Sequence, residues 1–287
     1  MAITLRNYRG SEDLQLQQDF WIQATRPLPW CWKPTASPTL YSKGSQFDPR
    51  SRYFAFDGSQ LVGYCSFTGQ GEFVSLGYPW VLPGYEGEVQ ERLYNAVYGF
   101  AASQEYGGKS FAQRFRQQWT AQISFFTRHG FVVQRCDPIY ALDLRAVEKP
   151  RAARTSDLAR SAEFSWEDFR TLSEHRYPPE QLSMWRQYFE TVDFDFAVKV
   201  SREEMCVAYL GLTIRIDTGF AEIVAAALEP VALEALRPAL IVACAELQSR
   251  KATHLGTKLL PLSGSDAMLE EFGFKKVTEE VLMSKTI

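Results

Sequence analysis

The segment Phe54-Ala-Phe-Asp-Gly-Ser-Gln-Leu-Val-Gly63 places apolar runs on both sides of an Asp-Gly-Ser turn. Asp-Gly favours the tight turns that join antiparallel strands, so the segment predicts a β-hairpin. A similar pattern recurs later, where the strand-like runs Phe196–Val200 and Val207–Ile216 flank the turn residues Ser201-Arg-Glu-Glu204. The two hairpins begin at Phe54 and Phe196, which are 142 positions apart.

A second pair of landmarks repeats at nearly the same distance. The helix-stopping dipeptides Gly130-Phe131 and Gly273-Phe274 are 143 positions apart, so they follow the starts of their hairpins by 76 and 77 residues. Agreement to one residue predicts an internal repeat, with a generic α/β pattern as the alternative. The 287 residues then form two similar domains, 1–147 and 148–287, with Lys149-Pro150-Arg151 expected in the linker.

Hydrophobic periodicity predicts the same order of elements in both halves. The expected strands are Phe73–Leu82, Ser110–Gln118, Phe220–Leu228 and His254–Leu259, and the expected helices are Glu88–Gln104, Thr120–Arg128, Pro238–Arg250 and Ser265–Glu271. A strand pair is expected after each Gly-Phe dipeptide, and in the first half Phe131–Leu144 would form two strands joined by Asp137-Pro138. The predicted fold class is therefore mixed α/β (α+β), with a mixed, mostly antiparallel sheet flanked by helices in each domain.

Composition argues against several classes of protein. The 31 Lys and Arg against 34 Asp and Glu give a net charge of −3, whereas nucleic-acid binders usually carry a basic excess. The longest apolar run, Ala239–Ala245, has seven residues, so we expect no membrane span. The five cysteines form no Cys-x-x-Cys motif and the three histidines lack metal-ligand spacing. We therefore expect no metal site, and reduced thiols in a cytoplasmic protein.

The repeated unit resembles the GNAT superfamily, which has the N-acetyltransferase fold. In the first half the resemblance rests on the hairpin 54–63 and on Phe125-Phe-Thr-Arg-His-Gly-Phe131, which is similar to the family's Phe-Tyr-x-x-x-Gly-Phe signature. In the second half, Ala221-Glu-Ile-Val-Ala-Ala-Ala-Leu-Glu-Pro230 looks like the family's fourth strand, and Met268-Leu-Glu-Glu-Phe-Gly-Phe274 like its C-terminal signature. The resemblance covers nearly the whole chain as a tandem repeat.

The resemblance implies a site for acetyl-CoA, or another acyl-CoA, where the fourth strand gives way to a helix. A glycine-rich turn there lets backbone N–H groups and the helix N-terminus approach the pyrophosphate. The first half keeps Tyr85 and Gly87 at this turn but has Glu86 where the family has a basic residue. The second half has no glycine between Pro230 and Ala239, and the implied contacts are Leu228, Ala235, Leu236 and Arg237. Both loops are degenerate relative to the family pattern.

The resemblance also implies catalytic and substrate-binding residues. Glu222 matches the fourth-strand Glu that serves the family as general base, and the alternative is a solvent-facing carboxylate on a strand. The tyrosine that would protonate the leaving thiolate is replaced by Phe126 in the first half and by Leu269 in the second. Trp30 and Trp32 could line the acceptor pocket, or pack on the core as a hydrophobic flap.

Two classes of function stay open from the sequence. The leading hypothesis is an acyl-CoA-dependent N-acyltransferase, in the simplest case an N-acetyltransferase, that modifies the amine of a small molecule through Glu222 and the loop 229–239. The alternative is a catalytically degenerate GNAT-fold protein that binds a ligand or partner, which the departures in both loops favour. The expected partner is a small-molecule amine rather than nucleic acid or a membrane, and the chain is expected to be a monomer or homodimer.

Overall fold

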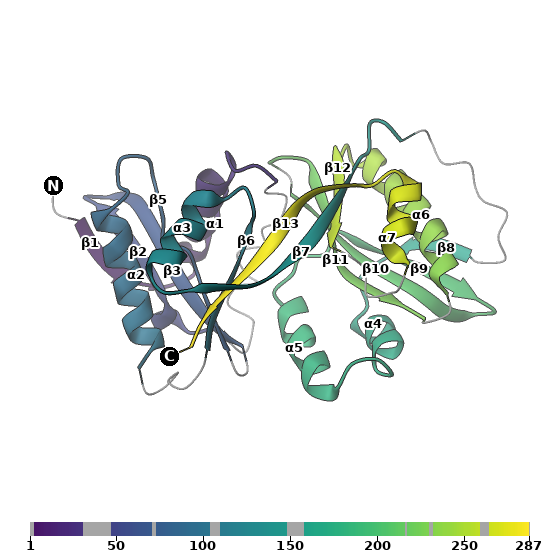
Figure 1. The fold of residues 1–287 in the computed structure, drawn as a ribbon, viewed down its shortest axis with the longest axis horizontal. Helices are drawn as coiled ribbons and strands as arrows, with labels where there is room; N and C mark the ends of the chain where they lie inside the picture. The colour runs from purple at the N-terminus through teal and green to yellow at the C-terminus, as the bar shows by residue number, and fades with distance from the viewer. Residues whose placement is uncertain are drawn as a thin grey trace. The chain divides into compact units, whose positions relative to one another are not determined.

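A computed structural model describes residues 3–30, 47–70, 73–103, 110–147, 158–215, 217–229, 232–258 and 264–286. These residues fall into two compact units (Figure 1). Unit 1 contains the described residues up to 136 together with those from 280 onward, and unit 2 contains those from 137 to 279. The boundary between residues 147 and 148, which was drawn from the repeat, stays a prediction.

Unit 1 is built on a mixed sheet. Its strands are β1 (Ile3–Asn7), β2 (Arg52–Asp57), β3 (Gln60–Gln70), β4 (Phe73–Leu76), β5 (Trp80–Val81), β6 (Ser110–Arg116) and the end of β13 (Lys275–Lys285). The order across the sheet is β1-β2-β3-β4-β6-β13, and β5 pairs with β3. β4 and β6 are parallel, and the other pairs are antiparallel. The hairpin expected at Phe54 is confirmed as β2–β3.

Unit 2 repeats this plan. Its strands are the end of β7 (Val132–Asp143), β8 (Leu158–Ala162), β9 (Phe196–Arg202), β10 (Met205–Arg215), β11 (Phe220–Leu228) and β12 (His254–Lys258). The order is β7-β12-β11-β10-β9-β8, in which β11 and β12 are parallel and the other pairs antiparallel. The second predicted hairpin is confirmed as β9–β10.

Helices flank both sheets (Figure 1). Unit 1 has α1 (Glu12–Thr25), the 3-10 turn η2 (Pro49–Ser51), α2 (Glu88–Ala101) and α3 (Thr120–Arg128). Unit 2 has α4 (Trp166–Ser173), α5 (Pro179–Phe189), the 3-10 turn η3 (Leu233–Ala235), α6 (Leu236–Ser249) and α7 (Ser265–Phe272). The predicted fold class, mixed sheets flanked by helices, is confirmed. No described helix is both long enough and apolar enough to cross a membrane.

The repeat extends to the register of the strands. The parallel pair in each unit spans three residue pairs, ending at Ser75 opposite Ala112 in unit 1 and at Glu222 opposite Gly256 in unit 2. The antiparallel register on the other side of the first strand of each pair also shifts by one residue in both units. In unit 1 the shift lies between the pairing of β3 with β4 and its pairing with β5. In unit 2 it lies between β10 and β11 and leaves Val224 as a bulge opposite no residue of β10. Ser75 therefore occupies in unit 1 the position that Glu222 holds in unit 2.

Three strands differ from the sequence prediction. The single strand expected over Phe73–Leu82 is wrong: the run is divided into β4 and β5, and Pro79, which has no N–H to donate, stands between them. Val132–Asp143 is the single strand β7, so the expected pair of strands joined by Asp137-Pro138 is wrong, and the pair expected after Gly273 is likewise the single strand β13. Proline fixes φ at about −65°, which a strand tolerates, and it favours extended backbone in the residue before it. It therefore interrupts a strand only where its missing N–H must bond. Residues 139–143 of β7 complete the sheet of unit 2, and residues 280–285 of β13 complete the sheet of unit 1.

The main core of each unit lies between its sheet and one helix, which is α2 in unit 1 and α6 in unit 2. In unit 1, α2 packs with the end of β13 through buried side chains such as Leu93 and Met283. In unit 2, α6 packs with β10 and β11 through side chains such as Leu240 and Ala221. The opposite face is covered by α1 in unit 1 and by α4 and α5 in unit 2.

Met283 tests whether the end of β13 belongs to the core of unit 1. Its side chain is fully buried, so alanine would remove apolar contacts and leave a cavity. We expect Met283→Ala to lower the free energy of unfolding by about 2–4 kcal/mol in urea denaturation. Ser284→Ala, on the opposite face of the same strand, should change it by less than about 0.5 kcal/mol. Equal effects of the two substitutions would contradict this packing.

Candidate active site

Glu222 lies where two parallel strands of unit 2 separate. β11 pairs with β12 only at Phe220, Ala221 and Glu222 among the described residues. Beyond Glu222, β11 continues to Leu228 and pairs with β10 on its other edge. The N–H and C=O groups on the β12 edge of β11 then have no strand partner among the described residues, and we call this interval between the two strands the gap. Such an unpaired strand edge can bond a ligand that carries amide groups.

The carboxylate of Glu222 points to the face of the sheet covered by α4 and α5. Its neighbours Ala221 and Ile223 pack into the core beside α6, and side chains alternate along a strand, so Glu222 lies on the other face. The residue is only 8% exposed, so the expectation of a solvent-facing carboxylate is wrong. Its catalytic role stays a prediction.

Thr213 is the nearest cross-strand neighbour of Glu222 on β10. The two residues are directly opposite in the antiparallel register, so their side chains share one face of the sheet. Thr213 is fully buried, and its hydroxyl has no hydrogen-bond partner within the described part of the chain. A buried hydroxyl without a partner is costly, and beside a buried carboxylate it is a group that a bound ligand can satisfy.

Small side chains line the strand beyond the point of separation. Three consecutive alanines, residues 225–227, follow the bulge at Val224. Ala225 and Ala227 pack on the α4 face, and Ala226 packs toward the α6 core. The side chains on both faces of this part of β11 are therefore methyl groups.

The loop that leads from β11 into α6 brings together the second-half residues expected at the cofactor. Leu228, Ala235 and Leu236 are buried, and the backbone N–H of Ala235 donates to the carbonyl of Ala232. Arg237, in the first turn of α6, is about half exposed and lies 3.4 Å from Glu271. Pro230 and Val231 lie outside the described residues. The first turn of α6 carries no acidic residue, so its positive N-terminal potential is not offset there.

The corresponding gap in unit 1 is filled by aromatic side chains. Tyr78, just beyond β4, has its ring centroid 6.3 Å from that of Phe115 on β6, 5.4 Å from Phe125 and 6.5 Å from Phe126 on α3. The side-chain amide of Gln90 on α2 donates to the Tyr78 hydroxyl at 2.7 Å and fixes the ring. The position of Glu222 holds Ser75, so unit 1 lacks the carboxylate.

In the loop before α2 in unit 1, a carboxylate bonds to the backbone. Glu86 accepts a hydrogen bond of 2.7 Å from the backbone N–H of Gly84. Gly87 caps α2 with φ 84°, as the expected turn requires, and the Tyr85 hydroxyl donates to Asp57 at 3.0 Å. The first turn of α2 also carries Glu88 and Glu91, which repel an anion. Tyr85 and Gly87 thus belong to unit 1, whereas Glu222 belongs to unit 2.

The remaining candidates contribute less. Trp30 is partly buried with φ 56°, whereas Trp32 and Cys31 lie outside the described residues, so the tryptophan pocket stays a prediction. Burial raises the pKa of Cys244 to about 12 and that of Cys206 to about 11, which keeps both thiols protonated at neutral pH. The described residues include no group of three or more His, Cys, Asp or Glu suited to a metal ion.

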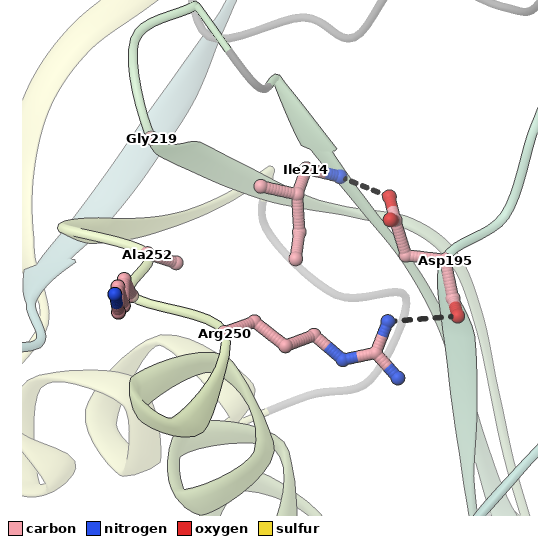
Figure 2. Close-up of a pocket in the computed structure, with 6 residues that line it drawn as sticks. Asp195, Ile214, Gly219, Arg250 and Ala252 are labelled. Carbon is pink, nitrogen blue, oxygen red and sulfur yellow. Dashed lines mark hydrogen bonds between the residues drawn. The ribbon is translucent and has the colours of Figure 1, made fainter.

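A pocket of about 400 Å³ lies elsewhere in unit 2 (Figure 2). Its lining includes Asp195, Ile214 and Arg250, and the carboxylate of Asp195 accepts a hydrogen bond from the backbone N–H of Ile214. Ile214 packs against the same core as α6, so this pocket is on the face of the sheet opposite Glu222. We do not assign the active site to it.

Sequence reasoning missed Thr213, Tyr78 and the bond between Glu86 and Gly84. Thr213 acquires meaning only from its register opposite Glu222, and one sequence does not specify strand register. The run of alanines at 225–227 was a visible signal, because an internal strand usually carries larger side chains.

Comparison with known proteins supports the fold. No protein-family model and no curated protein matches the sequence. A tandem GNAT protein from the clavulanic acid biosynthesis pathway matches with a TM-score of 0.70 at 14% identity, over 99% of this chain and 98% of that chain. A GCN5-related N-acetyltransferase from Sphaerobacter thermophilus matches with a TM-score of 0.62 at 12% identity, over 99% and 95%. The chain therefore has the GNAT fold.

The unpartnered hydroxyl of Thr213 predicts an unusual effect on stability. Thr213→Val keeps the shape of the side chain and removes the unsatisfied group, so we expect the free energy of unfolding to rise by up to about 1 kcal/mol. Thr257 is the matched control, because it is equally buried and its hydroxyl donates to the carbonyl of Lys258 at 2.9 Å. Thr257→Val should lower the free energy of unfolding by about 1 kcal/mol. Equal losses in both variants would mean that the Thr213 hydroxyl is satisfied.

Proposed function

We propose that the protein is an acyl-CoA-dependent N-acyltransferase, in the simplest case an N-acetyltransferase, that acts on a small-molecule amine at the gap of unit 2. The observation that carries the proposal is the buried carboxylate of Glu222 at the point where β11 and β12 separate. The GNAT fold of the chain is consistent with this reaction. The protein acts in the cytoplasm, as a monomer or homodimer.

The gap has the chemistry to hold acyl-CoA. The pantetheine arm carries amide groups, which can bond to the free edge of β11 as an added strand would. The alanines at 225–227 leave space for the arm beside that edge. At the end of the strand, the N-terminus of α6 and the guanidinium of Arg237 supply positive potential for the phosphates.

Glu222 supplies the base that the reaction needs. The amine nitrogen attacks the thioester carbonyl, the C–N bond forms, and the C–S bond then breaks. Glu222 accepts the proton that the nitrogen loses, directly or through water. The thiolate leaves and takes a proton from solvent. Because a thiol has a pKa of about 8.5, this step needs no tyrosine as proton donor, and Leu269 stands where the family has that tyrosine. Positioning of the two reactants supplies much of the rate.

Unit 1 favours the second candidate function, ligand binding without acyl transfer. The aromatic filling around Tyr78 and the occupied N–H of Gly84 both disfavour acyl-CoA in that unit. We therefore assign catalysis to unit 2 alone and treat unit 1 as a degenerate copy. The whole protein would be such a binding module if unit 2 also failed to bind acyl-CoA.

Glu222→Gln tests the catalytic assignment. Release of free CoA thiol from acetyl-CoA would be followed with a panel of small primary amines. The amide cannot accept the proton, so we expect kcat to fall by about 100-fold or more while the KM for acetyl-CoA changes by less than about threefold. Glu204→Gln, at an exposed turn, should match the unsubstituted protein. An unchanged kcat in Glu222→Gln would exclude Glu222 as the base.

The two cofactor loops are tested by calorimetric titration with acetyl-CoA. Arg237→Ala removes the charge near the phosphates and should weaken binding by about three- to tenfold. Glu86→Arg restores the basic residue of the family pattern in unit 1. Because the aromatic side chains around Tyr78 still prevent acetyl-CoA from binding there, the dissociation constant for acetyl-CoA should stay within about twofold of its original value. Tighter binding in Glu86→Arg would move the site to unit 1, and no binding at millimolar acetyl-CoA in any variant would contradict the enzyme assignment.

A further inference from the structure

Arg52 carries a buried charge on the face of unit 1 that α1 covers. It is the first residue of β2 and is 7% exposed. Phe54, two residues along the strand, packs with Phe20 of α1 and Tyr64 of β3, so Arg52 shares this face of the sheet. The gap filled by Tyr78 and the acidic loop before α2 form no part of this region.

The guanidinium of Arg52 is only partly satisfied. Nη1 donates to the Tyr64 hydroxyl at 3.0 Å and to Oε1 of Gln17 at 3.3 Å, and the ring of Phe47 lies 4.8 Å from Cζ. Nε is buried without a hydrogen-bond partner, and Nη2 makes no hydrogen bond to any described residue. The free donors are therefore on one edge of the group.

The other buried arginines in the described ranges are paired with carboxylates. Arg116 lies 3.1 Å from Glu280, and Arg215 lies 2.6 Å from Asp217. Arg52 has no ion pair within the described part of the chain, and its hydrogen-bond partners, Tyr64 and Gln17, are both neutral. An unpaired buried charge costs several kcal/mol unless something else compensates it.

We propose that Arg52 is the anchor of a binding site for a small oxoanion in unit 1, either a carboxylate or a phosphate group of a small molecule. The Nε–Nη2 edge presents two parallel N–H donors, which is the geometry that binds two oxygens of one carboxylate or phosphate. Ser66 lies opposite Arg52 in the register and adds a hydroxyl on the same face. The site belongs to unit 1 and does not depend on the acyltransferase proposed for unit 2.

The proposal is tested by NMR on the full chain with nitrogen-labelled arginine. Sodium phosphate and sodium acetate are titrated separately, with sodium chloride as the control for ionic strength. We expect the Nε–H resonance of Arg52 to shift saturably with phosphate, with acetate or with both, and not with chloride. The salt that saturates at the lower concentration identifies the class of anion. The absence of a saturable shift with either oxoanion would overturn the proposal.

Matched variants distinguish bidentate binding by the paired N–H donors of Arg52 from attraction to positive charge in general. Arg52→Lys keeps the charge and loses the paired donors, so the affinity for the effective anion, measured by calorimetry, should fall by at least about tenfold. Arg114→Gln removes an exposed arginine from unit 1 and should leave the affinity within about twofold. Equal binding by Arg52→Lys would contradict the site. If that variant does not fold, the Nε–H titration of the unsubstituted protein decides alone.

Discussion

The separation of the parallel strands β11 and β12 after three residue pairs is the constraint on which this account depends. A strand inside a sheet normally forms backbone hydrogen bonds on both edges. Beyond Glu222, β11 pairs with a strand on one edge only among the described residues. The bulge at Val224 is followed by three alanines, so the side chains along this part of β11 are small. Because the carboxylate lies at the last paired residue, the same backbone feature positions both the proposed cofactor and the proposed base.

The two halves show how one plan of strands and helices can diverge. Both units have a three-residue parallel pair, a one-residue slip in the adjacent ladder and a helix of 14 residues after it. In unit 1 the gap holds Tyr78 and its aromatic neighbours, and the loop N–H is bonded by Glu86. Buried aromatic side chains contribute strongly to packing, so unit 1 is packed with aromatic rings where unit 2 has an unpaired strand edge and the unsatisfied hydroxyl of Thr213.

Much of the fold could be predicted from the sequence because it rests on local patterns. The two hairpins, the helices after the fourth strands and the repeat all follow from short-range periodicity and turn residues. The completion of unit 1 by β13 could not be predicted, since it pairs residues such as Arg116 and Glu280 that are 164 positions apart. The same limit applies to the site: Glu222 was found from its motif, whereas Thr213 and Tyr78 required the register and the packing.

Hydrogen exchange of the whole chain, followed by mass spectrometry with and without acetyl-CoA, tests the central claim most directly. A ligand that bonds the free edge of β11 slows exchange of the amides it covers. The account predicts that acetyl-CoA protects peptides spanning residues 222–240 and leaves those spanning 74–92 unchanged. Protection confined to 74–92, or no protection anywhere at saturating acetyl-CoA, would contradict it.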